Sequence, residues 1–247
     1  MNKYIVVVAG EPYSVFFEIL FKSIKLKKIK KPYLLVCSKK LLIAQMERLR
    51  FNFNINVIEK KNIKNLRFKN NHINILDVKF KFKKAFDKIN YSSTKYIEKC
   101  FKEGLHLVKG SKCKILINGP VSKKYFLKKK FLGMTEYFAQ KTGKKDKEVM
   151  LIYNNRLSVS PITTHLPIQN VAKKISIKKI INNVTAINSF FKSQLKKKAK
   201  FAITGLNPHC ETVKKFSEEK KIILPAIKIL KKKILKLVDL FQLIQFF

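Results

Sequence analysis

The chain has 247 residues, 46% of them hydrophobic, which is enough for one large domain or two small lobes and excludes compositional disorder. It carries 55 Lys and Arg against 15 Asp and Glu, a formal charge of +40. The excess is almost all lysine and is spread along the chain, whereas nucleic-acid surfaces favour arginine with interleaved aromatic residues. The pattern therefore favours drift towards A/T-rich codons over a nucleic-acid partner, which stays open as the alternative.

Cysteine usage and hydropathy argue against secretion and membrane insertion. Cys37, Cys100, Cys113 and Cys210 form no CxxC pair, so neither a zinc ribbon nor a redox motif is indicated. The apolar run near the start meets Glu11 too early for a signal peptide. No uncharged stretch approaches the length of a membrane span. We therefore expect a cytoplasmic protein with no membrane anchor.

The first sixty residues alternate apolar runs with helical patterns. Three runs predict strands, at Tyr4–Ala9, Pro32–Cys37 and Ile55–Ile58, and the intervening segments predict helices at Val15–Ile24 and Lys39–Arg50. The continuous apolar run of the first strand is typical of a strand that is buried on both faces. This β-α-β-α-β order indicates a parallel sheet.

A polar, basic segment follows, from Lys60 to Lys84, and its short apolar piece Ile73–Val78 is interpreted as part of a peripheral hairpin. Ser92 or Ser93 can then cap a helix that ends near Lys109.

Two histidines fall in this part of the chain. His72 lies beside asparagines in the basic segment, and His106 lies within the predicted helix. We expect a solvated loop histidine and a helical surface histidine rather than metal ligands.

The predicted buried strand Lys114–Asn118 opens into a turn that contains Ser122 and Lys123. Lys123 is a candidate contact for an anionic substrate, although lysine is so abundant here that any single one is weak support.

The second half contains fewer apolar runs. The predicted elements are a helix at Met134–Lys141, a hairpin of Glu148–Tyr153 and Arg156–Ile162 around Asn154–Asn155, a helix at Ile175–Lys192, a strand at Phe201–Thr204, and a last helix from Ser217 that is kinked at Pro225. An apolar stretch, Ile234–Phe247, ends the sequence.

Two histidines follow predicted strand ends. His165 follows the run Leu157–Thr164, and His209 lies in the turn that begins at Gly205, after Phe201–Thr204. Ligands of open α/β sheets bind beyond the carboxyl ends of strands, where two imidazoles can share one metal ion. The alternative is that both are hydrogen-bonded loop histidines.

No GxGxxG follows a strand and no GxxxxGK[ST] is present, which excludes a Rossmann-type phosphate loop. No Ser-His-Asp arrangement can be argued either.

Five stretches match, in order, the motifs of one enzyme family. GEPYSVFFEIL at Gly10 is similar to GDPAGIGPEI, NGPVSK at Asn118 to TGPVNK, and GMTEYFAQKTG at Gly133 to GHTEFLAERTG. TTHLP at Thr163 and GLNPH at Gly205 are identical to the family's motifs. The chain resembles the 4-hydroxythreonine-4-phosphate dehydrogenases, the NAD-dependent enzymes of pyridoxal phosphate biosynthesis.

The resemblance implies an α/β fold like isocitrate and isopropylmalate dehydrogenases, with two α/β/α lobes around a cleft and residues 1–247 as a single family domain. It implies a homodimer whose active site lies at the subunit boundary. The implied reaction is oxidation of the 3-hydroxyl of 4-phosphohydroxy-L-threonine by NAD, followed by decarboxylation.

By the same resemblance, His165 and His209 are two of three histidines that hold a divalent metal, Zn, Mg or Co. Thr135 matches the substrate-binding threonine of GHTE, Met134 stands at that motif's histidine, and Lys123 is the other candidate substrate contact.

The sequence also departs from the family pattern. Ser14 and Phe16 stand at two motif glycines, and Cys210–Lys214 replaces a glycine-rich loop. No YHDQG motif, which carries the third metal histidine, is present, so we expect a domain that is incomplete at the C-terminus. Two alternatives stay open: a non-catalytic remnant or interaction protein that pairs through Ile234–Phe247, and a basic nucleic-acid-binding protein.

Overall fold

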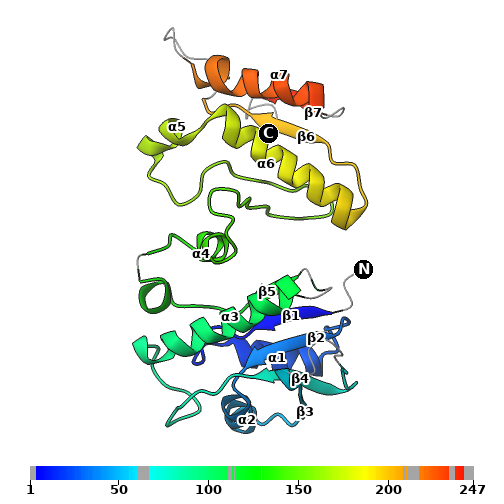
Figure 1. Cartoon of the computed structure of the whole chain (residues 1–247), viewed down its shortest axis with the longest axis vertical. Helices are drawn as coiled ribbons and strands as arrows, with labels where there is room; N and C mark the ends of the chain where they lie inside the picture. The colour runs from blue at the N-terminus through cyan, green and yellow to red at the C-terminus, as the bar shows by residue number, and fades with distance from the viewer. Residues whose placement is uncertain are drawn as a thin grey trace. The chain divides into compact units, whose positions relative to one another are not determined.

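The structure is a computed structural model that describes residues 4–60, 67–110, 113, 115–128, 130–207, 210, 217–233 and 237–241 (Figure 1). The chain divides into two compact units, residues 1–134 (unit 1) and 135–247 (unit 2). Each unit is described by itself.

Unit 1 is built on a five-stranded sheet with the order β3-β4-β2-β1-β5, in which all neighbouring strands are parallel. Its elements are β1 (Ile5–Val8), α1 (Phe16–Lys25), β2 (Tyr33–Cys37), α2 (Lys39–Arg48), β3 (Asn54–Val57), β4 (His72–Asp77), α3 (Thr94–Gly110) and β5 (Leu116–Asn118). In the register, Val7 lies opposite both Leu35 and Ile117. The parallel sheet predicted from the β-α-β-α-β order is therefore confirmed.

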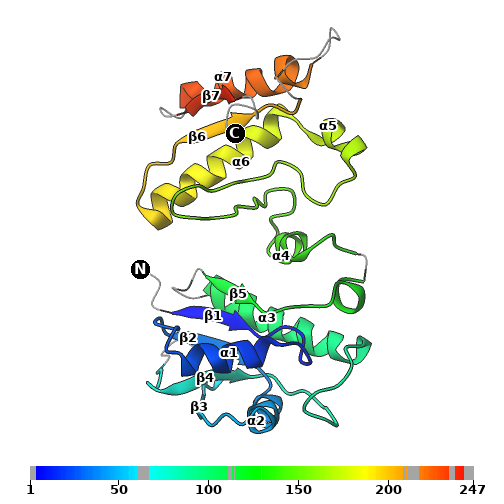
Figure 2. The ribbon, with the colours of Figure 1, turned by 180° about the vertical axis from the view of Figure 1, so that it is seen from behind.

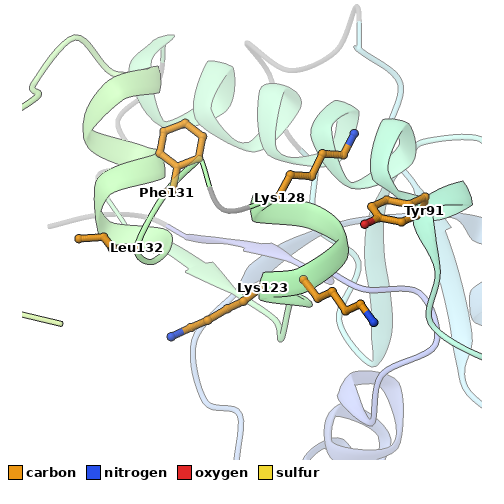
Figure 3. A pocket seen from close by; sticks show the side chains of 6 residues that line it. Tyr91, Lys123, Lys128, Phe131 and Leu132 are labelled. Carbon is orange, nitrogen blue, oxygen red and sulfur yellow. The ribbon is translucent and has the colours of Figure 1, made fainter. Parts of the chain in front are cut away.

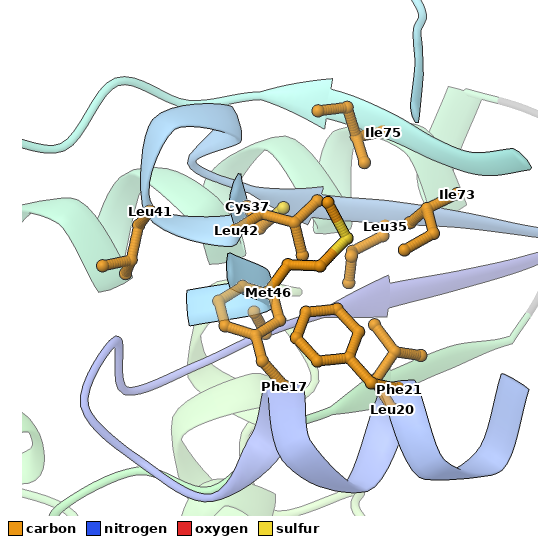
Figure 4. Packing of buried hydrophobic residues seen from close by; sticks show 11 residues of the cluster. Phe17, Leu20, Phe21, Leu35, Cys37, Leu41, Leu42, Met46, Ile73 and Ile75 are labelled. Carbon is orange, nitrogen blue, oxygen red and sulfur yellow. The ribbon is translucent and has the colours of Figure 1, made fainter. Parts of the chain in front are cut away.

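Helices cover both faces of this sheet, α3 on one face and α1 with α2 on the other (Figures 1 and 2). Phe17 and Phe21 of α1 and Met46 of α2 pack against Leu35 and Ile75 of the strands (Figure 4). Complete burial of an apolar side chain of this size stabilises the fold by about 1.5–3 kcal/mol. This cluster is the core on the α1 and α2 side of the sheet.

The peripheral hairpin expected around Ile73–Val78 is wrong. This segment forms β4, an interior strand between β3 and β2. Ile73, Ile75 and Leu76 are at most 2% exposed, because a strand in a parallel sheet is covered on both faces. The lysines on either side made a short buried strand look like part of a solvated loop.

Two smaller expectations for unit 1 also need correction. The helical segment before α3 is capped by Asn90, whose side-chain oxygen accepts a hydrogen bond from Ser92 N–H at 2.8 Å, rather than by Ser92 or Ser93. The strand β5 forms as expected, but it lies at the sheet edge, where Ile117 is 48% exposed, and so it is not a buried strand.

Unit 2 contains α4 (Met134–Lys141, which begins at the last residue of unit 1), α5 (Val171–Lys174), α6 (Ile177–Phe190), β6 (Phe201–Thr204), α7 (Leu224–Lys233) and β7 (Leu237–Phe241). The strands β6 and β7 form a parallel pair. Ile180 and Val184 of α6 pack against Ile227 and Leu230 of α7, together with Phe201 of β6. This cluster is the core of unit 2.

The predicted hairpin of unit 2 reduces to one antiparallel bridge, Ile152 to Val159. The expected strand Leu157–Thr164 does not form, and Leu157 is 73% exposed. The strand β6 forms where predicted, but its residues are half-buried or exposed rather than buried. Asn154–Asn155 is a local turn signal. The two strands that this turn would connect have no apolar surface to cover them.

The helix predicted from Ser217 is confirmed, with an irregular first part. A π-helical turn, Glu219–Ile223, runs directly into α7, and Pro225 lies in the first turn of α7. Proline has no N–H to donate to a preceding carbonyl, so a widened turn before it is physically expected.

Candidate functional site

The sheet order of unit 1 reverses at β1, which has β2 on one side and β5 on the other. Ligands of such sheets bind beyond the carboxyl ends of the strands at this switch point. The loops after β1 and β5 meet there: Glu11 N–H donates to Pro120 O at 2.8 Å, and Gly119 N–H donates to Val8 O at 2.7 Å. These two loops mark the position at which sheets of this kind bind ligands.

Two glycines make this close approach of the loops possible. A Cβ on Gly10, whose φ is +78°, would lie 2.4 Å from Pro120 O. A Cβ on Gly119 would lie 2.0 Å from Ala9 O. Both distances are far below any normal contact, so each loop needs glycine at this point.

Glu11 lies at the same switch point and is only 2% exposed. Neither carboxylate oxygen makes a hydrogen bond of normal geometry among the described residues. Burial raises the pKa of Glu11, and the nearby Ser93 hydroxyl and Tyr13 backbone amide oppose this only in part. The sequence analysis assigned Glu11 no functional role; its position directly after a buried strand was the available signal.

Lys123, the predicted substrate contact, is exposed and lines an open hollow of about 790 Å³ in unit 1. The other lining residues are Tyr91, Lys124, Lys128, Phe131 and Leu132. Lys128 Nζ lies 5.8 Å from the centre of the Tyr91 ring. Figure 3 shows Lys123 extending away from Tyr91 and Lys128, so these lysines do not converge on one point. The hollow is lined by three lysines, but they show no geometry that is specific for an anion.

Met134 and Thr135, the other two predicted substrate contacts, form the first turn of α4. Met134 is half-buried and Thr135 is exposed. The Thr135 side chain is therefore accessible to a ligand.

His165 is exposed and has a left-handed backbone, with φ of +56°. Its predicted partner, His209, lies outside the described residues. Among the residues that the structure describes, no group of three His, Cys, Asp or Glu side chains could hold a metal ion. Of the two histidines that were expected to share a metal ion, only His165 lies within the described residues.

The turn that precedes His209 has a clear structural basis. Glu219, only 1% exposed, accepts hydrogen bonds from Leu206 N–H at 2.9 Å and from Asn207 N–H at 2.8 Å through the same oxygen. Its other oxygen accepts from Ser217 Oγ at 2.6 Å and from Asn207 Nδ2 at 3.0 Å. Sequence reasoning missed Glu219 completely.

A histidine side chain is a donor of the kind that suits a divalent ion. Neutral imidazole is a good ligand for zinc and cobalt, His165 is accessible to solvent, and Glu219 holds the turn that leads to the second histidine. Two histidines would supply half of a tetrahedral shell, so further ligands would have to complete it.

Comparisons with known proteins bear directly on this arrangement. A family model described as "Pyridoxal phosphate biosynthetic protein PdxA" matches residues 28–243. The chain belongs to this family. The region matched in this PdxA-family chain includes both histidine motifs, TTHLP and GLNPH.

Two curated relatives of the PdxA-family chain are 4-hydroxythreonine-4-phosphate dehydrogenases. The one from Sulfurihydrogenibium is 33% identical over 93% of this chain and 71% of its own length. The one from Aquifex aeolicus is 27% identical over 96% of this chain and 73% of its own length. The resemblance stated from the motifs is thereby confirmed.

A solved structure shows the same fold. The 4-hydroxythreonine-4-phosphate dehydrogenase from Klebsiella pneumoniae superposes with a TM-score of 0.80 at 20% identity, over 97% of this chain and 75% of that chain. The α/β fold with a parallel five-stranded sheet is therefore shared with structures of the PdxA family. No helix in the described part of the chain is long and apolar enough to cross a bilayer.

Proposed function

We propose that this chain oxidises 4-phosphohydroxy-L-threonine at its 3-hydroxyl with NAD, and that the resulting β-keto acid loses carbon dioxide, as a step of pyridoxal phosphate biosynthesis. The observation that carries this proposal is the PdxA family match across both histidine motifs. The identity of 33% to a named dehydrogenase supports it further.

In this proposal His165 and His209 bind one divalent ion, Zn, Mg or Co. A bound ion of this kind supplies Lewis-acid stabilisation of the substrate oxygen, and bound NAD supplies the hydride acceptor. Thr135 orients the substrate through its hydroxyl, and Met134 contributes an apolar surface where the family motif has histidine. Lys123 attracts the substrate phosphate from the rim of its hollow.

We propose that residues 1–247 act as a single family domain of two α/β/α lobes around a cleft, as in isocitrate and isopropylmalate dehydrogenases. We also propose a cytoplasmic homodimer. Its support is residues 149–171, which we call the apolar arm. The arm contains Arg156 as its only charged residue, in a chain with a formal charge of +40.

The apolar arm exposes more hydrophobic surface than a solvated loop requires. Its exposed large side chains are Met150, Ile152, Tyr153, Leu157, Val159 and Ile168. Two copies of a strongly basic chain repel each other wherever lysines face lysines, so an uncharged apolar surface is where they meet at the lowest electrostatic cost. The arm also contains His165, which would place this histidine close to such an interface.

A second candidate is a non-catalytic member of the family that acts by binding another protein. The exposed apolar arm supports this candidate as well. The other segment considered for pairing, Ile234–Phe247, contributes the backbone of β7, and its side chains lie outside the described residues. Nucleic-acid binding is the weaker alternative, because the lysines are spread along the sequence of both units.

The test is NADH formation by the purified chain with 4-phosphohydroxy-L-threonine and added zinc, magnesium or cobalt. His165→Ala and His209→Ala remove the proposed ligands, and His106→Ala is the matched control because His106 is an exposed histidine on α3 of unit 1. We expect turnover by the unmodified chain and by His106→Ala, and its loss in the other two variants. A folded chain without turnover would favour the non-catalytic candidate.

A further inference from the structure

The helix α1 has large apolar side chains on its outer side as well as on its inner side. The inner side packs into the core between α1, α2 and the sheet (Figure 4). The outer side, together with the two residues that flank the helix, exposes Val15, Ile19, Lys22 and Leu26. Their spacing of i, i+4, i+7 and i+11 places them in one row, which we call the outer stripe. The exposed side of a surface helix is normally polar, whereas three of these four side chains are aliphatic.

The chain directly after α1 is rich in lysine and has a defined conformation. Lys27 has a left-handed backbone, with φ of +51°, and its N–H donates to Ile24 O at 2.9 Å. Lys28 N–H donates to Ser23 O at 3.0 Å. These two hydrogen bonds form a Schellman motif, which ends the helix and turns the chain away from its axis. The lysines that follow are therefore held beside the end of the outer stripe.

The residues around this turn combine charge with apolar surface. Lys25–Lys31 has the sequence KLKKIKK, in which five lysines are interrupted by one leucine and one isoleucine, and all seven residues are exposed. No Asp or Glu occurs in the sequence between positions 19 and 46. The last acidic residue before this stretch, Glu18, is paired with Lys22 at 2.6 Å. The outer stripe and Lys25–Lys31 together form a basic and apolar surface, which we call the α1 surface.

The lysines of the α1 surface identify no partner by themselves, because lysine is abundant in the whole chain. Positive charge near the last carbonyl groups of a helix is also favourable in itself, which accounts for Lys22 and Lys25 in the last turn of α1. Neither reason accounts for the exposed Ile19, Leu26 and Ile29, which leave apolar area in water. The aliphatic side chains among the lysines are therefore the feature that points to a partner.

The composition of the α1 surface distinguishes between three kinds of partner. Protein interfaces are enriched in aromatic residues and arginine and are depleted in lysine. Nucleic-acid surfaces favour arginine and exposed rings that stack on bases. Residues 15–31 contain no arginine, and their three phenylalanines are buried or half-buried. Exposed aliphatic side chains among lysines instead match a lipid surface with anionic headgroups.

We propose that the α1 surface binds reversibly to the surface of an anionic lipid bilayer. Ile19, Leu26 and Ile29 enter the boundary between headgroups and acyl chains, and the lysines reach the anionic headgroups with their long side chains. This mode of binding needs no membrane-spanning helix. It does not depend on the proposed reaction, in which no residue of the α1 surface has a role.

Both components of the α1 surface should contribute to binding. Each lysine close to an anionic lipid surface strengthens binding by about fivefold, so loss of three lysines should weaken it by about a hundredfold. Each aliphatic side chain that leaves water completely adds about tenfold or more. Loss of two that enter the boundary only in part should therefore weaken binding by about tenfold or more.

The experiment is cosedimentation of the full chain with vesicles of phosphatidylcholine, either alone or mixed with phosphatidylserine. One variant, Ile19→Gln with Leu26→Gln, removes two aliphatic side chains and keeps every lysine. Its matched control, Val57→Gln with Phe190→Gln, removes two exposed apolar side chains elsewhere in the chain. Circular dichroism establishes that each variant is folded.

A second pair of variants separates local charge from total charge. The first set removes three lysines of the α1 surface: Lys27→Gln, Lys28→Gln and Lys30→Gln. The second set removes three exposed lysines of unit 2: Lys144→Gln, Lys145→Gln and Lys147→Gln. Both sets remove three positive charges from a chain with a formal charge of +40. A difference in vesicle binding between them therefore reports the position of the charges.

We expect the unmodified chain to bind the mixed vesicles and to bind phosphatidylcholine alone much more weakly. Ile19→Gln with Leu26→Gln should weaken binding to the mixed vesicles by about tenfold or more, and the lysine set of the α1 surface by about a hundredfold. Both controls should stay close to the unmodified chain, because lysines farther than a Debye length from the lipid are screened. Added salt should weaken binding for the same reason.

Unchanged vesicle binding by folded Ile19→Gln with Leu26→Gln would overturn this proposal. Equal losses from the two lysine sets would also overturn it, since binding would then follow total charge alone. If the stripe variant does not fold, unchanged binding by Ile29→Gln, which lies outside the helix, would overturn the proposal in the same way.

Two further outcomes would contradict a lipid partner. The first is a failure of the unmodified chain to bind the mixed vesicles. The second comes from the same assay with polyuridylate, a single-stranded RNA, in place of vesicles. If the lysine set of the α1 surface lost binding to polyuridylate and kept binding to vesicles, the surface would belong to a nucleic-acid partner instead.

Discussion

Unit 1 packs apolar residues of α1 and α2 against one face of a five-stranded sheet, whereas unit 2 packs α6 and α7 together with residues of β6. The core of unit 1 includes aromatic residues that are completely buried, such as Phe21. In unit 2 the apolar arm, residues 149–171, stays exposed. Both units expose some large apolar side chains, but in unit 2 most of them lie within this one segment, which makes it the candidate surface for a partner to cover.

The two units also differ in how they bury a glutamate. Glu11 of unit 1 and Glu219 of unit 2 are both at most 2% exposed. Glu11 makes no hydrogen bond of normal geometry among the described residues, and its pKa is raised. Glu219 accepts several hydrogen bonds, and its pKa is lowered to about 2. Hydrogen bonding, rather than burial alone, decides which carboxyl stays ionised.

The largest effect is expected from removing an aromatic side chain from the core of unit 1. Phe21 is 0% exposed and its ring lies 5.5 Å from that of Phe51. Phe21→Ala should lower the free energy of unfolding by about 3–5 kcal/mol, because it leaves a cavity. Phe190→Ala in unit 2 is the matched control, since Phe190 is 41% exposed and should cost much less. Urea unfolding followed by circular dichroism measures both, and equal costs would contradict the comparison.

The next largest loss of stability is expected from replacing a glycine at the β1–β5 switch point. Gly119→Ala would place a Cβ 2.0 Å from Ala9 O, so the loops at the β1–β5 switch point have to separate, at a cost of about 1–3 kcal/mol or more. A Cβ added to Gly143 of unit 2 would meet no atom within 4 Å, and the φ of +68° is the only obstacle there. Gly143→Ala should therefore cost about 1 kcal/mol. Thermal unfolding compares the two, and a larger loss in Gly143→Ala would refute the packing argument.

The parallel order of unit 1 could be predicted because β1 and β2 are continuous apolar runs with helical patterns between them. The position of β4 could not be predicted in the same way. Its apolar run is short and lies in a basic segment, and only pairing with β2 and β3 makes it an interior strand. A run of this length is ambiguous until its neighbours are known.

The candidate site also shows that a residue's role cannot be predicted before its spatial neighbours are known. His165 and His209 could be selected because they follow predicted strands and lie in motifs. Glu219 could not be selected, since SEEKK has the composition of a solvated charge run. Its role arises from a turn whose backbone N–H groups converge on one buried oxygen. The hairpin around Asn154–Asn155 was predicted from a turn signal alone, and turn chemistry does not supply the cover that strands need.

The two glutamates predict opposite responses to pH. The folded pKa of Glu219, about 2, is below the ordinary value of 4.5, so its stabilisation is present above pH 4.5 and is lost as the pH falls towards 2. The folded pKa of Glu11 is raised, so its favourable neutral form is present below pH 4.5 and is lost as the pH rises through the raised pKa.

Thermal unfolding between acid and neutral pH tests this difference. Glu219→Gln should lower the unfolding temperature at neutral pH and have little effect near pH 2, the value of the folded pKa. Glu11→Gln should raise it at neutral pH, because a neutral amide replaces a buried charge, and should have little effect in acid. If both variants changed the unfolding temperature in the same direction at neutral pH, the two carboxyls would not differ in the way described.

A substitution in the apolar arm should have the smallest effect on the free energy of unfolding but a large effect on dimerisation. Leu157 is 73% exposed, so Leu157→Lys should change the free energy of unfolding by no more than about 0.5 kcal/mol. The new lysine adds charge to a surface whose only charged residue is Arg156. In a symmetric pair the arms of both copies would carry it, and the like charges should drive the dimer towards monomer.

Leu26→Lys is the matched control, because Leu26 is 66% exposed in unit 1 and already lies among lysines. Sedimentation velocity should show dimer for the unmodified chain and for Leu26→Lys, and monomer for Leu157→Lys. Added salt should restore part of the dimer of Leu157→Lys, since ions screen repulsion between exposed charges. A dimer that survives Leu157→Lys would place the subunit contact elsewhere. The exposure of the arm would then favour a different partner, whose surface is apolar and carries no excess of positive charge.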